Sequence, residues 1–441
     1  MTVIGSHAAV LGGGMSGLMA AHVLTRHFER VTLVERDDPG DAAPRRGVPQ
    51  GRHPHALVLR AVDLLEELLP GMREQYVRDG GIPVGMMSQH RLFYFGHQLR
   101  QSDAGLDTVW ASRPFLEQGV RERLRGRVTM RQGWEAVRPL APTPERITGV
   151  VIGRTGGGES ETLTADLVVD ATSRTGRSRA WLSELGYPLP REERVRVDLA
   201  YATRILRCAP DVFGHDRAIA VGPRLDRARG LYFTVLEEGR WTLTVYGYGD
   251  FRPSPDTDTF MAQVAELAPD DVRAVVEAAE PLTDVHVFRV PETYRRRYDK
   301  LRRFPEGLLV TGDALAALNP LYGTGMMYSA AYALILDRRL REGLDGLSRR
   351  FFKDAARAVA GSWRFSSLSD SFLPGVGDSR LPGSRLALWY LRRLVAAAEH
   401  DAALAADFIR VASALRGPLA LARPGVLLGV LRPRTARSRR S

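Results

Sequence analysis

A glycine-rich turn between two apolar runs near the N-terminus restricts the fold of this chain more than any other feature. The first run, Ala8 to Leu11, leads into the turn and a helical pattern, and the second run ends at Glu35. Gly12, Gly14 and Gly17 fit the pattern G-x-G-x-x-G. A strand, a glycine turn, a helix and a second strand that ends in an acid form the βαβ unit of a dinucleotide site.

Each glycine of this unit has its own expected role. Gly12 makes the tight turn, Gly14 lets the backbone approach a pyrophosphate, and Gly17 lets the helix and the strand pack closely. The helix N-terminus would face the phosphates, and Glu35 would accept hydrogen bonds from a ribose diol. The predicted cofactor-binding residues of this unit are Gly12, Gly14, Met15, Ser16, Gly17, Glu35 and Arg36. The motif alone does not distinguish FAD from NAD.

The composition favours a protein of the reducing cytoplasm without a metal centre. A length of 441 residues suggests two or three domains, and 44% hydrophobic residues suffice for a core. The single cysteine, Cys208, excludes an intrachain disulfide and a cysteine-rich metal site. The ten histidines are scattered without ligand spacing, so we expect no metal.

The net charge of +11 does not indicate a nucleic-acid surface. Only Lys300 and Lys353 are lysines, so the other 60 of the 62 basic residues are arginines. They are scattered along the chain, apart from a dense run at the C-terminus that is typical of a disordered tail. All apolar stretches are shorter than the ~18 residues that a membrane span needs. We therefore expect neither nucleic acid nor a membrane as a partner.

The pattern along the chain predicts an α/β domain with an antiparallel sheet inserted into it. Residues 165–172, ADLVVDAT, read as a strand that is buried on both faces of a parallel sheet. Segments rich in β-forming residues then fill 188–290, interrupted by a helix at 257–280, and an apolar strand and a long helix return within 307–343. The predicted division is 1–75, 105–187 and 291–350 for the dinucleotide-binding domain, 76–104 and 188–290 for the sheet domain, and 351–441 for a C-terminal helical region with a basic tail.

Separated segments of the chain together resemble one enzyme class. LGGGMSG with VERD, WASRPFLEQGVRERL, and LLVTGDALAALNPLYGTGM resemble the FAD-dependent monooxygenases of the para-hydroxybenzoate hydroxylase and squalene epoxidase class. This resemblance implies an α/β, glutathione-reductase-like, Rossmann-type FAD-binding domain, an inserted antiparallel β-sheet substrate domain and a C-terminal helical region. GVPQGRHPHALVLR, VDLAYATR and SWRFSSLSD extend the resemblance to bacterial epoxidases of polyether polyketide pathways and related polyketide-tailoring flavoenzymes.

The resemblance implies further contacts to FAD. Arg113 would reach the pyrophosphate or the ribityl chain, because a guanidinium pairs well with phosphate. Asp313 would accept a hydrogen bond from the ribityl hydroxyls, and the loop after it would lead to a helix N-terminus that stabilises negative charge on the flavin. The other implied cofactor-binding residues are Arg45, Gln50, Arg52, Pro320, Gly323, Gly325 and Met326.

Aromatic residues of the sheet domain and the C-terminal region are the substrate-pocket candidates. They would line a cavity if the sheet covers the flavin, although aromatic residues on strands mostly belong to a core. The candidates are Tyr201, Tyr232, Phe233, Tyr246, Tyr248 and Trp363. No pair of residues stands out as a catalytic acid and base, so the catalytic residues stay unassigned.

The activity implied by the resemblance is insertion of one oxygen atom, as an epoxidase or hydroxylase, through a flavin C4a-hydroperoxide. The substrate would be a large apolar molecule, such as a polyketide intermediate in antibiotic biosynthesis. NADPH or NADH would bind transiently as the electron donor, because the chain has no second glycine fingerprint. A separate flavin reductase is an alternative donor.

A second activity stays open because the chain departs from its relatives at two positions. Ser173 follows the buried strand where relatives usually have glycine, and Thr324 stands where they often have Gln or His. Both changes could alter flavin reactivity. Some relatives in spirotetronate and spirotetramate pathways keep FAD as a structural element and catalyse a [4+2] cyclisation. The alternative is therefore an FAD-containing cyclase.

Overall fold

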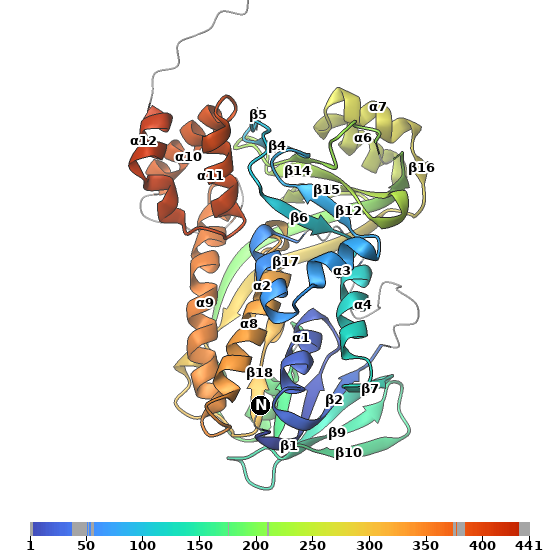
Figure 1. Ribbon diagram of the computed structural model, residues 1–441, viewed down its shortest axis with the longest axis vertical. Coiled ribbons are helices and arrows are strands. Elements are labelled where there is room, and N and C mark those ends of the chain that lie inside the picture. Colours follow the sequence, from blue (N-terminus) through green and yellow to red (C-terminus); the bar gives the residue numbers. More distant parts are fainter. Residues whose placement is uncertain are drawn as a thin grey trace, which may run out of the picture.

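The computed structural model describes residues 3–37, 51, 53, 57–174, 176–209, 211–373, 376 and 384–431. The expectations for Arg45, Gln50, Arg52 and the basic tail lie outside the described residues. Within the described part, the chain forms an α/β region, a region built on a large sheet, and a group of C-terminal helices (Figure 1).

A parallel sheet carries the predicted βαβ unit. Its strand order is β18-β11-β1-β2-β7, and all neighbouring strands are parallel. The strands are β1 (Gly5–Leu11), β2 (Phe28–Glu35), β7 (Thr129–Gln132), β11 (Leu167–Asp170) and β18 (Leu308–Val310). Every residue of β11 is buried, as predicted for its apolar run. The predicted α/β architecture is confirmed.

Helices cover one face of this sheet, and a small antiparallel sheet covers the other. Helix α1 packs against α4 and α8. The helices of this region are α1 (Met15–Leu24), α2 (Leu59–Leu68), α3 (Met72–Arg78), α4 (Arg113–Leu124), α5 (Arg177–Glu184) and α8 (Gly325–Leu340). The small sheet has the order β10-β9-β8, with β8 (Trp134–Leu140), β9 (Gly149–Arg154) and β10 (Ser160–Thr164). Ser112 caps α4 by accepting the Phe115 N–H.

The second region is built on a large, mainly antiparallel sheet. Its order is β19-β17-β12-β15-β14-β13-β4-β5, with β16 paired to β12. The strands are β4 (His90–Tyr94), β5 (His97–Gln98), β12 (Glu192–Arg207), β13 (Ala218–Val221), β14 (Arg229–Val235), β15 (Arg240–Tyr248), β16 (Glu280–Pro281), β17 (His286–Arg296) and β19 (Ala316–Ala317). β14 and β15 form a hairpin, with Gly239 at positive φ in its turn.

Two details of this region differ from the sequence expectation. The helix predicted at 257–280 is two helices, α6 (Thr257–Leu267) and α7 (Asp270–Ala278), because Pro269 cannot continue a helix. The segment before β4 does not join the large sheet: β3 (Ile82–Gly85) pairs with β6 (Asp107–Trp110).

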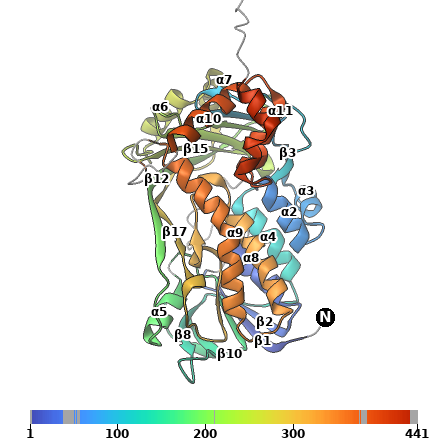
Figure 2. The same cartoon turned by 90° about the vertical axis from the view of Figure 1, so that its left-hand side faces the viewer.

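The C-terminal helices connect the two regions. Helix α9 (Leu347–Asp370) runs beside α8 and continues to the large sheet (Figure 2). It is followed by α10 (Ser384–Ala398), α11 (Ala402–Ala412) and α12 (Pro424–Leu431). Among the described residues, each helix is either too short or too polar to cross a bilayer.

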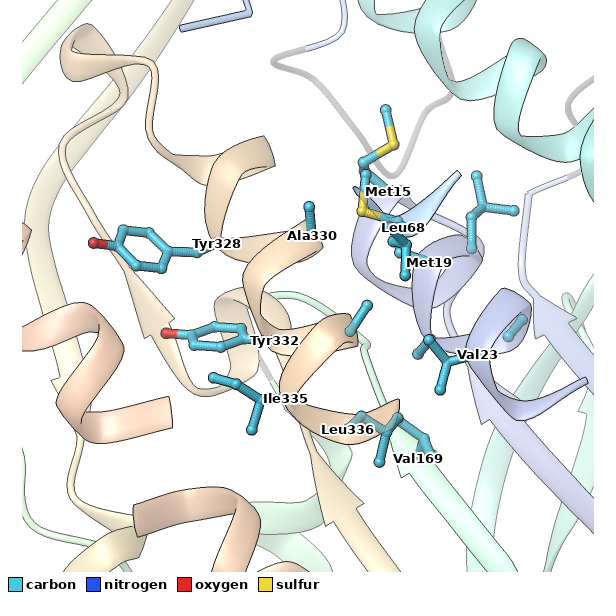
Figure 3. Packing of buried hydrophobic residues seen from close by; sticks show 14 of the residues in the cluster. Met15, Met19, Val23, Leu68, Val169, Tyr328, Ala330, Tyr332, Ile335 and Leu336 are labelled. Atoms are coloured by element: carbon cyan, nitrogen blue, oxygen red, sulfur yellow. The ribbon is translucent and has the colours of Figure 1, made fainter. Parts of the chain in front are cut away.

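The contact between α1 and α8 forms the centre of the main core. Met15, Met19 and Val23 of α1 face Ala330 and Leu336 of α8 (Figure 3). All five side chains are buried. This packing holds the N-termini of both helices at the same end of the parallel sheet.

Gly17→Ala should destabilise the protein, because a Cβ at Gly17 would overlap the carbonyl oxygen of Gly12. Overpacking of this kind costs about 1–3 kcal/mol. Gly361→Ala is the matched control, since a Cβ at that position on α9 meets nothing within 4 Å and alanine favours the helix. Urea denaturation of both variants measures the difference, and equal stability would contradict the packing role of Gly17.

Candidate functional site

A cavity of about 1080 Å³ extends from the β1–α1 turn to the large sheet. Most of its wall comes from four groups of residues. They are the glycine turn with the end of β2, the segment after β11, the loop leading into α8, and one face of the large sheet together with α9 to α11.

The glycine turn forms one end of the cavity. Gly12 has a φ of 99°, and a Cβ there would lie 2.6 Å from the Ala171 carbonyl oxygen. Glu35 lies at the cavity wall, where its Oε2 accepts the Gly13 N–H at 2.6 Å and its Oε1 accepts the Asp37 N–H at 3.0 Å. These bonds fix the carboxylate beside the N-terminus of α1. Gly14, Met15, Ser16 and Arg36 also line the cavity, whereas Gly17 acts in packing.

Charged side chains surround the next part of the cavity. Asp313 lines it in the short 3-10 helix after β18, and burial raises the pKa of this carboxyl while Arg174 and Arg113 oppose the shift. Arg113 also lines the cavity, and its Nε lies 2.7 Å from Glu117 Oε1. The Arg174 guanidinium donates to the Glu292 carbonyl at 2.6 Å and lies over the Tyr294 ring. The arginines are thus held by the protein next to the buried acid.

The loop before α8 brings a helix N-terminus to the cavity. Pro320, Gly323, Gly325 and Met326 line the wall, and Gly323 has a φ of 64°. The first N–H groups of a helix lack partners within the helix, and they carry the positive end of its dipole. Thr324 is the N-cap residue but makes no side-chain capping bond. This end of the cavity therefore favours negative charge on a ligand.

The sheet contributes a wall of aromatic side chains, and two of the six sequence candidates are corrected. Tyr201, Tyr232, Tyr246 and Tyr248 line the cavity, and the Tyr232 and Tyr246 rings stack at 5.1 Å. Phe233 does not line it, because neighbouring residues of a strand point to opposite faces.

Phe233 and Trp363 belong to the core instead. The Phe233 ring packs at 5.0 Å from Trp241, in the cluster beneath α6 and α7. Trp363 is buried on α9, where the Arg295 guanidinium lies 5.4 Å from the centre of its ring.

In the segment after β11, only Ser173 was expected to influence the flavin, and the other residues were not among the predicted contacts. Thr172, Ser173, Arg174 and Arg177 all line the cavity. Ser173 has a φ of 69°, a backbone conformation that favours glycine. The available signal was a run of polar and basic residues directly after a buried parallel strand, where ligands bind in α/β sheets.

Asp370 is a second residue whose role the sequence did not reveal. It ends α9 and is 1% exposed, and its Oδ1 accepts hydrogen bonds from Asn319 Nδ2 at 3.0 Å and Tyr322 Oη at 2.9 Å. Burial raises the pKa of Asp370 to about 6, although the bonds from Asn319, Tyr322 and Tyr248 oppose the shift. The described residues contain no cluster of His, Cys, Asp and Glu that could hold a metal ion.

Asp370→Asn should stabilise the protein more at pH 8 than at pH 5. The pKa of Asp370 is raised to about 6 in the folded state, so the folded protein favours the protonated carboxyl. The stability that this preference gives is present at low pH and is lost as the pH rises through about 6. The gain in unfolding free energy of the variant over the wild type should grow by about 1 kcal/mol between these pH values. Urea denaturation at both pH values measures it, and a constant difference would contradict the raised pKa.

Glu35→Ala should weaken FAD binding, because each hydrogen bond from a ribose hydroxyl to a charged acceptor contributes about 1.5–3 kcal/mol. Glu159→Ala is the control, since Glu159 is an exposed acid in the β9–β10 turn. Fluorescence titration of the apoprotein with FAD gives both dissociation constants. An unchanged affinity in Glu35→Ala would show that the adenosine end of the cofactor lies elsewhere.

Comparisons with known proteins agree with this geometry. The profile of a family described as "FAD binding domain" matches residues 6–355. Protein Rv3254 of Mycobacterium tuberculosis is 32% identical over 428 residues, which cover 92% of this chain and 88% of the relative. Kynurenine 3-monooxygenase of Salinispora tropica is 28% identical over 381 residues, which cover 79% of this chain and 75% of the relative.

A solved structure shows the same fold. HpxO of Klebsiella pneumoniae, in complex with FAD and uric acid, superposes with a TM-score of 0.66 at 16% identity, covering 94% of this chain and 98% of HpxO. The glycine turn, the fixed Glu35 carboxylate and the α8 N-terminus are the features that an FAD site needs. The chain belongs to the FAD binding domain family, within the flavin-dependent monooxygenase superfamily.

Proposed function

We propose that this protein is an FAD-dependent monooxygenase that inserts one oxygen atom into a large, mostly apolar molecule. The observation that carries the proposal is the continuity of the cavity. It joins the glycine turn around Gly12 and the N-terminus of α8 to the aromatic wall around Tyr246. Cofactor and substrate would therefore share one continuous cavity. The likeness to kynurenine 3-monooxygenase supports the same class of activity.

Bound FAD supplies the oxygen-activating chemistry, and the residues of this chain hold and surround it. The β1–α1 turn and Glu35 bind the adenosine and pyrophosphate part. Asp313 accepts hydrogen bonds from the ribityl chain, and Arg113 balances the charge of the pyrophosphate. The N-terminus of α8 stabilises negative charge on the flavin ring. These roles agree with the positions of the residues along the cavity wall.

The sheet side of the cavity excludes water and orients the substrate. Tyr201, Tyr232, Tyr246 and Phe288 present mainly apolar surface to the cavity. A site without bulk water protects reactive intermediates from hydrolysis and other side reactions. The protein therefore contributes positioning and a dry environment, while the cofactor carries the oxidation.

The resemblance in sequence supports a more specific proposal for the reaction, the substrate and the electron donor. We propose epoxidation or hydroxylation of a polyketide-type intermediate in the cytoplasm, with NADPH or NADH as a transient electron donor. A flavin reductase is the alternative donor. A large substrate is supported by the extent of the cavity. The cavity continues from the residues that would hold the cofactor to the aromatic face of the sheet.

The test is anaerobic mixing of the FAD-loaded protein with NADPH or NADH, followed by addition of oxygen. We expect the flavin absorbance to bleach and then to return with consumption of oxygen. Gly14→Val is the control, because its branched side chain blocks the approach of the pyrophosphate and should leave a colourless protein. A flavin that stays oxidised with both nicotinamides and with a flavin reductase would contradict the proposal.

Product analysis separates the monooxygenase from the cyclase alternative. Candidate polyketide substrates are incubated with the FAD-loaded protein, and the products are analysed by mass spectrometry. A monooxygenase adds the mass of one oxygen atom and needs both oxygen and a reductant. An isomerised product of unchanged mass, formed without oxygen and with oxidised flavin, would identify a cyclase instead.

A further inference from the structure

A buried carboxylate lies directly behind the cavity wall, on the side formed by α9. The Oδ1 of Asp370 receives hydrogen bonds from Asn319 Nδ2, Tyr322 Oη and, at 3.5 Å, Tyr248 Oη. The Asn319 amide also donates to the Tyr248 oxygen at 3.1 Å. We call these four residues the Asp370 network. Its donors come from the loop before α8 and from the end of β15, so the network connects three elements.

Within the part of the chain that the structure describes, no cationic side chain pairs with the negative charge of this network. Among the ion pairs of the described residues, none includes Asp370. Burial raises the pKa of Asp370 to about 6, so the group is ionised at neutral pH only because neutral donors surround it. A charge kept at a cost to stability is a common sign of a functional group.

The carboxylate fixes the direction of the tyrosine hydroxyls. An ionised carboxylate can only accept hydrogen bonds, so Tyr322 and Tyr248 must point their protons at Asp370. Both tyrosines line the cavity, as does Ser369. The oxygen of Tyr322 therefore keeps a lone pair that can accept a hydrogen bond from a ligand, because its own proton is donated to Asp370.

We propose that the Asp370 network is a substrate subsite that selects a hydroxyl group over an ether or a ketone. The inference rests on the proposed function, because the same cavity would hold the substrate, and it adds the chemical class: an apolar molecule that carries a hydroxyl. An ammonium group fits less well, because Asp370 is covered by the tyrosines and direct contact with the charge is blocked. Asp370 is a positioning residue that acts through Tyr322.

The selectivity should depend on pH. The groups that face Asp370 are Asn319, Tyr248 and Tyr322, and burial raises the pKa of both tyrosines well above the ordinary value. The tyrosines therefore stay protonated at neutral pH. As the pH falls through about 6, Asp370 gains a proton and becomes a donor, and the tyrosine hydroxyls can turn toward the cavity. The preference for a hydroxyl should then decrease.

The experiment compares two probes of similar shape, 2-naphthol and 2-methoxynaphthalene. Equilibrium dialysis with the FAD-loaded protein at pH 8 gives both dissociation constants. We expect the wild type to bind 2-naphthol roughly tenfold more tightly, the factor that one hydrogen bond can supply. Tyr322→Phe removes the acceptor and Asp370→Leu frees the tyrosine protons, so each variant should bring the ratio close to one. The wild type at pH 5 should show a smaller ratio than at pH 8.

Asp354→Asn is the matched control, because Asp354 lies on the same helix but pairs with Arg339 away from the cavity. It should keep the wild-type preference. Equal binding of the two probes by the wild type, binding of neither probe, or a preference that survives in Tyr322→Phe would overturn the proposal. Should Asp370→Leu fail to fold, Tyr322→Phe decides alone. Dialysis needs neither oxygen nor a nicotinamide, so its result is independent of the monooxygenase test.

Discussion

The close contact between the β1–α1 turn and the first helix is the constraint on which the rest of the site depends. Gly17 leaves no room for a side chain against Gly12, and this lets α1 begin directly at the end of β1. The N-terminus of α1 therefore reaches the edge of the parallel sheet, where Glu35 ends the neighbouring strand. Helix α8 packs against α1 and places a second helix N-terminus at the same edge. Two positive helix ends and one fixed acid then define where a dinucleotide can lie.

The large sheet and α9 extend this edge into a large cavity. The glycine turn and the α8 N-terminus form one part of the cavity wall, and the aromatic face of the sheet forms another part. Helix α9 spans both regions and brings Asp370 to the point where they meet (Figure 2). The site is therefore assembled from segments that are far apart in the sequence, from Gly12 to the C-terminal helices.

The buried carboxylate of Asp370 lowers the stability of the protein while it orients groups at the cavity wall. Asp370 is 1% exposed and forms no ion pair among the described residues, so its ionised carboxylate costs free energy. An amide or an apolar side chain at this position would avoid that cost. The chain instead keeps an acid that fixes the orientation of two tyrosine hydroxyls at the cavity wall. Orientation of neutral groups by a buried charge is one way to give an apolar cavity a defined polarity.

The sequence by itself determined the parallel sheet, the glycine turn and the acid at the end of β2, because these depend on local patterns and short spacings. It also located the α8 loop through Asp313 and the glycines after it. The tertiary structure decided which aromatic residues face the cavity: Tyr232 and Phe233 are neighbours, and only the placement of the sheet determines which face is open. It alone brought Asp370 to Asn319, across 51 positions in the chain. Contacts of this kind arise when separate elements pack, and no local pattern encodes them.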